Sequence, residues 1–161
     1  MPGLTAGQFT RAEAGDNAKL LATAASGLLA GALTFVSFVD TRTILRLVHE
    51  GESKLVTRYF SVWWPNGRDL MLPLVLTTGA LHGAAYALTS ELGWLWTAAA
   101  ATSIGPYTRV VLGEDIAALR DAGTAKVATI ARRFCMLHHP RTLIAAATFA
   151  VALRSLSTPR R

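Results

Sequence analysis

Two side chains near the C-terminal end of the chain could together move a proton. His138 and Arg141 lie three residues apart in the segment Leu137-His-His-Pro-Arg, so they share one face if this segment is helical. A neutral imidazole can take a proton from an acidic carbon or a phenol, and a fixed guanidinium can stabilise the anion that remains. The same basic residues could instead anchor the segment among lipid phosphates. Their spacing leaves both interpretations open.

A second group of polar side chains interrupts an apolar stretch. Thr78, His82 and Tyr86 follow one another at intervals of four residues and form one polar stripe on a helix. Such a stripe could line an apolar pocket with a proton acceptor and a phenol donor, and Trp64 is a further candidate for a pocket wall. The stripe could instead join two helices, because a polar group inside a membrane usually faces the bundle interior and bonds to a neighbouring Ser or Thr.

The composition favours a membrane protein. Of 161 residues, 52% are apolar and only 16% are charged, whereas soluble domains are about 25% charged. The net charge is +6, but the Lys and Arg residues flank apolar runs and form no block typical of nucleic-acid binding. Cys135 is the only cysteine, which excludes an internal disulfide. There is no glycine-rich phosphate loop and no HExxH motif, and the four histidines are scattered, so we expect no metal site.

Uncharged stretches of the length that crosses a bilayer, roughly 17–25 residues, occur three times. Residues 20–39 hold 20 residues without a formal charge, residues 70–90 hold 21 and residues 92–108 hold 17. A fourth stretch, 142–153, holds only 12 residues and reaches full length if its helix begins near Phe134. The pattern predicts an all-α, membrane-embedded four-helix bundle. The alternative is three spans and one short interfacial helix.

Charge predicts how this bundle is oriented. The membrane domain is expected over residues 20–155, between a polar tail at 1–19, taken as a mobile arm or short interfacial helix, and a basic tail at 156–161. Residues 40–69 carry five Lys or Arg and residues 109–141 carry six, against five in the two tails and the adjoining Arg154 together. The positive-inside rule then places both long loops on the cytosolic side and both termini opposite. Both loops have helical amphipathic patterns, so we expect them to extend the helices beyond the bilayer.

Small residues predict where the helices pack. Lipid removes the hydrophobic drive between helices, so close packing must replace it. Gly27 and Gly31 lie four residues apart in the first stretch, and Gly79 and Gly83 lie four apart in the second. Each pair leaves a flat face, on which we expect another helix to approach. The second and third stretches are separated only by Glu91, which predicts a tight antiparallel hairpin.

Four short segments carry a resemblance to a known family. They are Gly31-Ala-Leu-Thr-Phe-Val-Ser-Phe-Val, Trp64-Pro-Asn-Gly followed by Pro73, Gly105-Pro-Tyr-Thr-Arg-Val-Val-Leu, and Leu137-His-His-Pro-Arg-Thr. In this order they resemble the anthrone oxygenase-like family of small four-helix membrane proteins, over about residues 20–155. Two positions depart from the family pattern: Asp40 stands where a proline is expected, and Asp115 stands where the family usually has an asparagine.

The resemblance implies a function. It implies that the chain oxidises an anthrone to an anthraquinone with molecular oxygen and without an organic cofactor. His138 would be the base, and Arg141 with Tyr107 would hold the oxyanion. The implied partners are the lipid bilayer, a lipophilic aromatic substrate and O2, and a homo-oligomer or partner membrane subunits are compatible with them.

The alternative is a non-catalytic structural membrane protein or a small subunit of a larger membrane complex. An enzyme needs a cavity beside His138, Arg141 and Tyr107. A structural subunit should instead have a filled interior and a face of small residues that binds a partner.

Overall fold

The computed structural model describes residues 6–121 and 126–157, and every regular element in this part of the chain is a helix. The elements are α1 (Ala6–Phe35), the π-helical turn η1 (Val36–Asp40), α2 (Thr41–His49), α3 (Ser53–Thr89), α4 (Leu92–Val111), α5 (Gly113–Arg120) and α6 (Val127–Ser157). α1, η1 and α2 follow one another without a break. The predicted all-α class is therefore confirmed for the described residues.

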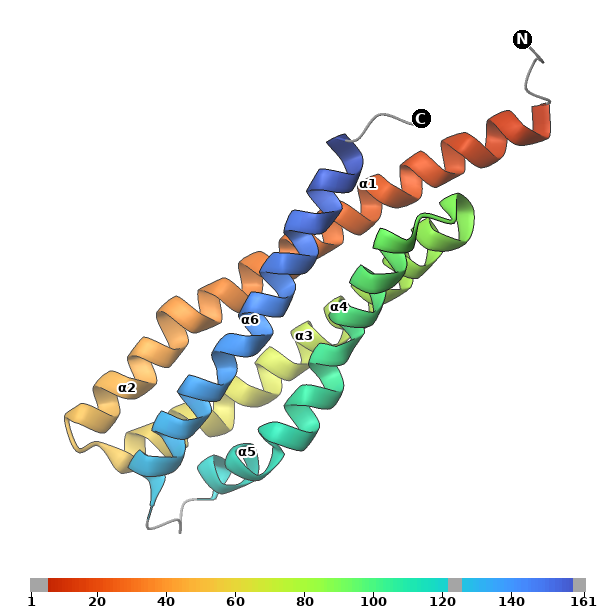
Figure 1. Ribbon diagram of the computed structural model, residues 1–161. Helices are drawn as coiled ribbons and strands as arrows, with labels where there is room; N and C mark the ends of the chain where they lie inside the picture. The colour runs from red at the N-terminus through yellow and green to blue at the C-terminus, as the bar shows by residue number, and fades with distance from the viewer. Residues whose placement is uncertain (1–5, 122–125, 158–161) are drawn as a thin grey trace.

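The four long helical segments form an elongated antiparallel bundle (Figure 1). The beginning of α1, the end of α6 and the α3–α4 turn lie at one end, and the α2–α3 turn and α5 lie at the other. Residues 6–19, expected as a separate arm or short interfacial helix, are instead the first turns of α1. The loop at 40–69 is also mostly helical, because α2 extends the first helix and α3 begins at Ser53. Only a short turn interrupts it, where Gly51 has a φ of +78° that favours glycine.

The α3–α4 turn is the tight hairpin that the sequence predicts. Two residues separate the helices, and the first of them, Ser90, has a left-handed φ of 59°. The second, Glu91, forms an ion pair with Lys19 of α1 and accepts a hydrogen bond from the Trp94 indole (3.0 Å). This carboxylate therefore fastens the hairpin to α1 and closes that end of the bundle.

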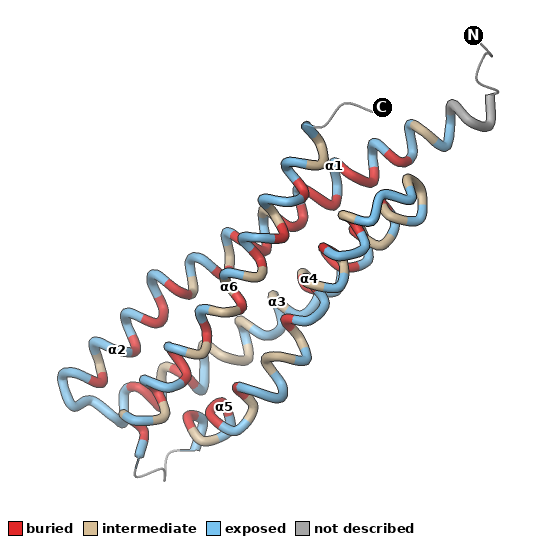
Figure 2. The backbone as a smooth tube through the Cα atoms, viewed as in Figure 1, coloured by how far each residue is buried: buried red, intermediate tan, exposed pale blue. Residues whose placement is uncertain are grey.

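Core packing differs between the two ends of the bundle, although the buried residues face inward along its whole length (Figure 2). Near the hairpin, the core consists of one indole and small residues: Trp94 with Ala18, Ala22, Ala85 and Ala152. Near α5, the core is built around the large rings of Phe60 and Phe134. Small residues let helices approach closely, whereas large rings hold them apart. The α5 end is therefore the end where a pocket can form.

The outer surface of the bundle is apolar. Two helices, Thr10–His49 and Ser53–Thr89, are long and apolar enough to cross a membrane by length and composition. α4 and α6 contain the other two uncharged stretches, 92–108 and 142–153. Large apolar side chains are exposed on each of the long helices, among them Leu28, Phe35, Leu70, Trp96 and Leu143. A helix of a soluble bundle usually has charged and polar residues on that face.

The two glycine pairs differ in what they contact. A side chain on Gly79 would collide with the Thr102 methyl group of α4, and one on Gly27 would lie 3.0 Å from an aromatic ring of α6. Nothing lies within 4 Å of the corresponding positions on Gly31 and Gly83. The close approach of helices therefore occurs at the first glycine of each pair.

The Gly79→Ala substitution should lower the free energy of unfolding by about 1–2 kcal/mol, because overpacking against Thr102 outweighs the better helix propensity of alanine. The matched control, Gly83→Ala, should raise it by up to about 1 kcal/mol. Adding Thr102→Ala should relieve the collision and restore most of the stability of Gly79→Ala. Unfolding followed by circular dichroism in detergent measures all three variants. Equal effects of the two glycine substitutions would contradict the close approach.

Candidate functional site

His138 and Arg141 meet on one face of α6, and both are buried, with 1% and 5% of their surface exposed. Nη2 of Arg141 donates a hydrogen bond to Nδ1 of His138. Because a guanidinium has only donors, His138 is the acceptor, and its proton is on Nε2. Nε2 lies 3.5 Å from the carbonyl oxygen of Leu33 in α1, to which it donates. His138 is therefore a neutral imidazole whose basic nitrogen faces the arginine.

A π-helical turn lies next to the Leu33 carbonyl, which accepts the hydrogen bond from His138. In η1, a backbone amide bonds to the carbonyl five residues earlier, and such turns often occur at functional sites. The Leu33 carbonyl, just before η1, also accepts a hydrogen bond from the Thr142 hydroxyl (3.3 Å). Ser37 of η1 lies 2.7 Å from the same hydroxyl. These polar contacts fix α6 against α1 next to His138.

Arg141 is a buried cation without a counter-ion among the residues that the structure describes. Nη1 donates to the Thr108 hydroxyl (3.0 Å) and Nη2 to His138, but Nε has no hydrogen-bond partner. None of the ion pairs found within 6–121 and 126–157 includes Arg141. A buried charge costs several kcal/mol unless something compensates it. The guanidinium is therefore an attractive site for an anionic oxygen.

Asp40 lies at the end of η1, and its carboxylate bonds away from Arg141. It accepts a hydrogen bond from the Tyr59 hydroxyl (2.7 Å). The other buried carboxylate near this end, Asp115, pairs with Arg133. Both carboxylates are thus engaged away from Arg141.

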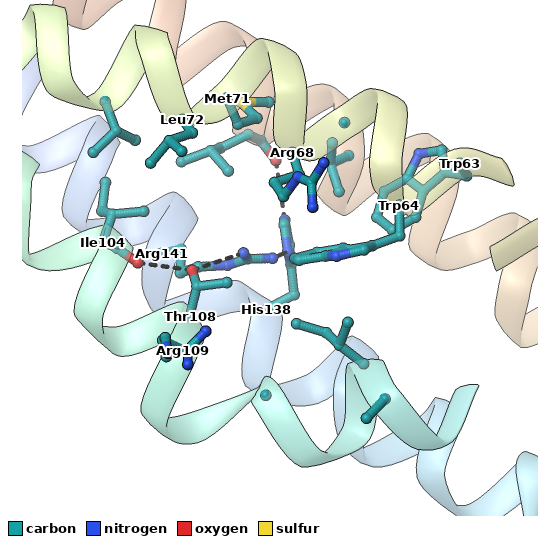
Figure 3. Close-up of a pocket in the computed structure, with 18 of the residues that line it drawn as sticks. Trp63, Trp64, Arg68, Met71, Leu72, Ile104, Thr108, Arg109, His138 and Arg141 are labelled. Carbon is teal, nitrogen blue, oxygen red and sulfur yellow. Dashed lines mark hydrogen bonds between the residues drawn. The ribbon is translucent and has the colours of Figure 1, made fainter. Parts of the chain in front are cut away.

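A pocket of about 790 Å³ opens in front of His138 and Arg141 (Figure 3). It lies between α3 on one side and α4 and α5 on the other, with His138 and Arg141 of α6 between them. Most of its lining is apolar, from Leu33, Val36, Trp63, Trp64, Met71, Leu72, Val75, Ile104, Ile116 and Ala117. Ligand pockets have volumes of roughly 300–1,000 Å³, so this one is large enough for a molecule of a few fused rings.

Aromatic packing holds one wall of the pocket in place. Trp64 stacks on Phe60 with their ring centres 5.9 Å apart and meets Phe134 edge-on at 6.1 Å. The Phe134 ring in turn lies 6.4 Å from the His138 ring. Trp64, a candidate from the sequence, therefore presents its indole to the pocket beside His138 (Figure 3).

Tyr107 does not line the pocket. Its hydroxyl donates to the carbonyl of Leu137 (2.9 Å), so it ties α4 to α6 one residue before His138. The next residue, Thr108, is the one on α4 that bonds to Arg141. The Tyr107 hydroxyl is therefore bonded to the α6 backbone beside the site, and the oxyanion role that the resemblance implies for it stays a prediction.

The polar stripe of Thr78, His82 and Tyr86 lies away from this pocket. His82 is fully buried and bridges three helices: Nδ1 lies 2.6 Å from the Thr97 hydroxyl of α4, and Nε2 donates to the Ala22 carbonyl of α1 (3.1 Å). Thr78 bonds to the backbone of its own helix, and Tyr86 packs against the small-residue core. His82 thus makes the interhelical hydrogen bonds that were the alternative to a pocket lining, whereas Thr78 bonds within α3.

Several pocket residues are not among the site residues predicted from the sequence. Arg68 of α3, Arg109 of α4, and Glu114 and Arg120 of α5 all line it. Arg109 directly follows the Pro-Tyr-Thr segment, and its charge alone does not distinguish a pocket residue from an anchor at the membrane surface. α5 turns back toward α3 after Gly113, and no periodicity in the sequence indicates this reversal.

Comparison with protein-family models, curated proteins and solved structures gives no match to this chain. The resemblance to the anthrone oxygenase-like family therefore rests on the short segments quoted above. Within the described ranges, no three His, Cys, Asp or Glu side chains come together as metal ligands.

Replacing Arg141 with Met should raise the free energy of unfolding of the ligand-free protein by about 1–3 kcal/mol, because it removes an uncompensated buried charge at similar volume. Arg46→Met, on the exposed face of α2, is the matched control and should change stability by less than about 0.5 kcal/mol. Thermal unfolding in detergent measures both. A clear loss of stability in Arg141→Met would show that the cation is already compensated.

Proposed function

We propose that the chain is a membrane-embedded oxygenase that oxidises a flat, lipophilic anthrone-like compound to the quinone with O2. One observation carries the proposal: the unpaired Arg141 cation and the neutral His138 base both line an apolar pocket. A structural subunit, the alternative from the sequence, needs neither a pocket nor a buried cation without a counter-ion.

The surface of the bundle supports the membrane part of the proposal. The two apolar helices Thr10–His49 and Ser53–Thr89 and the large side chains exposed around the bundle suit a lipid environment. On this proposal α4 and α6 complete four spans, and the beginning of α1 and the end of α6 lie on the side opposite to α5 (Figure 1). A lipophilic substrate and O2 both concentrate in a bilayer, so lateral entry between α3 and α4 would deliver them to the pocket.

Substrate binding would release the base. In the ligand-free site, the lone pair of His138 Nδ1 is occupied by a hydrogen bond from Arg141. A carbonyl oxygen of an anthrone is a competing acceptor, and it becomes a stronger one as negative charge develops on it. Once Arg141 turns to this oxygen, Nδ1 is free to take a proton from the acidic methylene carbon. The Leu33 carbonyl keeps the ring oriented through Nε2 while Nδ1 gains its proton.

The oxidation then balances with O2 alone. The carbanion gives one electron to O2, and the two radicals combine to form a carbon–oxygen bond, which leaves a peroxide anion. His138 returns its proton to the outer peroxide oxygen. Loss of the second methylene proton forms the carbonyl, breaks the O–O bond and releases water. One oxygen atom enters the quinone and the other enters water, so the carbon loses four electrons and O2 gains four.

Purified protein in nanodiscs should consume one O2 for each anthrone oxidised, as measured with an oxygen electrode and by quinone absorbance. His138→Ala should lower the rate about 100- to 10,000-fold, because it removes the base. His139→Ala is the matched control and should keep the wild-type rate, since this neighbouring histidine is exposed and lies outside the pocket. A wild-type rate no faster than empty nanodiscs, or a His138→Ala rate equal to wild type, would refute the proposal.

A further inference from the structure

Most of the charged residues that line the pocket are positive. Four arginines and one glutamate line it, which gives a formal excess of three positive charges: Arg68, Arg109, Arg120, Arg141 and Glu114. Among the described residues, only the first of these arginines takes part in an ion pair, with its exposed neighbour Asp69. The remaining three have no carboxylate within ion-pair distance in that part of the chain.

These cations occupy two depths. Arg68, Arg109 and Arg120 are exposed, so they stand at the mouth of the pocket, whereas Arg141 is 5% exposed and lies at its inner end. Figure 3 shows Arg68 and Arg109 on opposite walls, with His138 and Arg141 between them. Apolar walls between the two depths lower the local dielectric, which strengthens the attraction of an anion to both.

We infer that the pocket selects aromatic acids: flat apolar molecules with a carboxylate that pairs with the arginines at the mouth while a ring oxygen reaches Arg141. The inference rests on the proposed function, whose substrate class it narrows. The indole of Trp64 offers a face for the ring system, and the unpaired Nε of Arg141 marks a donor that an oxygen can still fill. A bulky lipid headgroup would reach the mouth but not a guanidinium that is only 5% exposed at the inner end of the pocket.

The test uses binding without turnover. Anthraquinone carboxylate and hydroxymethyl anthraquinone have the same ring system with its ring oxygens, and neither has the ring methylene that is oxidised. Protein in phosphatidylcholine nanodiscs is titrated with each, and binding is followed by quenching of tryptophan fluorescence with empty nanodiscs as the blank. The carboxylate should bind at least about tenfold more tightly than the alcohol, because it gains charge-assisted hydrogen bonds.

Matched variants show which arginines bind the carboxylate. Arg109→Gln combined with Arg120→Gln should abolish the preference for the carboxylate and leave the affinity for the alcohol unchanged. Arg141→Met should weaken the binding of both ligands, because each has an oxygen that can reach this depth. Arg46→Met, far from the pocket on α2, should bind both ligands as wild type does. Equal affinities of wild-type protein for the two ligands would overturn the inference.

A titration in a different lipid distinguishes an aromatic carboxylate from a lipid headgroup as the anion that the site binds. Replacing part of the phosphatidylcholine with phosphatidylglycerol should leave the affinity for anthraquinone carboxylate within about twofold. If phosphatidylglycerol displaces the carboxylate at one lipid per protein, the site belongs to a lipid headgroup and the inference is wrong. If the carboxylate is preferred but no anthrone is oxidised, the proposed function fails and the inference stands. If anthrone is oxidised without a preference for the carboxylate, only the inference fails.

Discussion

The contact between Arg141 and His138 is the interaction on which the site depends. A guanidinium cannot accept a hydrogen bond, so its contact with Nδ1 settles the tautomer of the histidine and points the other ring nitrogen at Leu33. The arginine itself is only partly satisfied, by Thr108 on α4 and by the histidine. Such a group lowers the stability of the empty protein, and this is expected where a structure is organised for a ligand rather than for stability.

The rest of the bundle holds this contact in place from two directions. At the hairpin end, the Glu91 carboxylate and the His82 side chain join α1, α3 and α4 through buried polar contacts and small residues. At the other end, the large rings of the core leave room for the pocket, and α5 forms part of its wall. A rigid, closed end and a wider end let one small bundle combine stability with a pocket. Tyr107 contributes by fixing α4 to the backbone just before His138.

Two features of the structure could be predicted from residues that are close together in the sequence. The hairpin at Glu91 follows from two apolar stretches with almost nothing between them, and the shared face of His138 and Arg141 follows from helical spacing. The sequence could not assign Thr108 to the arginine in place of Tyr107, because adjacent residues on a helix differ by about 100° in direction and the rotation of α4 depends on packing.

The reversal at α5, which brings Glu114 and Arg120 to the pocket, depends on tertiary contacts such as the pair of the buried Asp115 with Arg133. For the same reason, the spacing of the two glycine pairs could not show that, of these four glycines, only Gly27 and Gly79 lie where another helix approaches closely. Spacing along one helix is fixed by backbone geometry, whereas the partner that each face meets is fixed by the packing of the whole bundle.

The most direct test of the account is NMR of isotope-labelled histidine nitrogens in nanodiscs, with the His138 signals assigned by their loss in His138→Gln. The account predicts a neutral ring with its proton on Nε2 in the ligand-free protein. It also predicts that the Nδ1 resonance moves on addition of anthraquinone carboxylate, whose ring oxygen can reach Arg141, toward the position that it has in ligand-free Arg141→Met. A doubly protonated ring, a proton on Nδ1, or an Nδ1 resonance that is unchanged by both the ligand and the arginine substitution would contradict it.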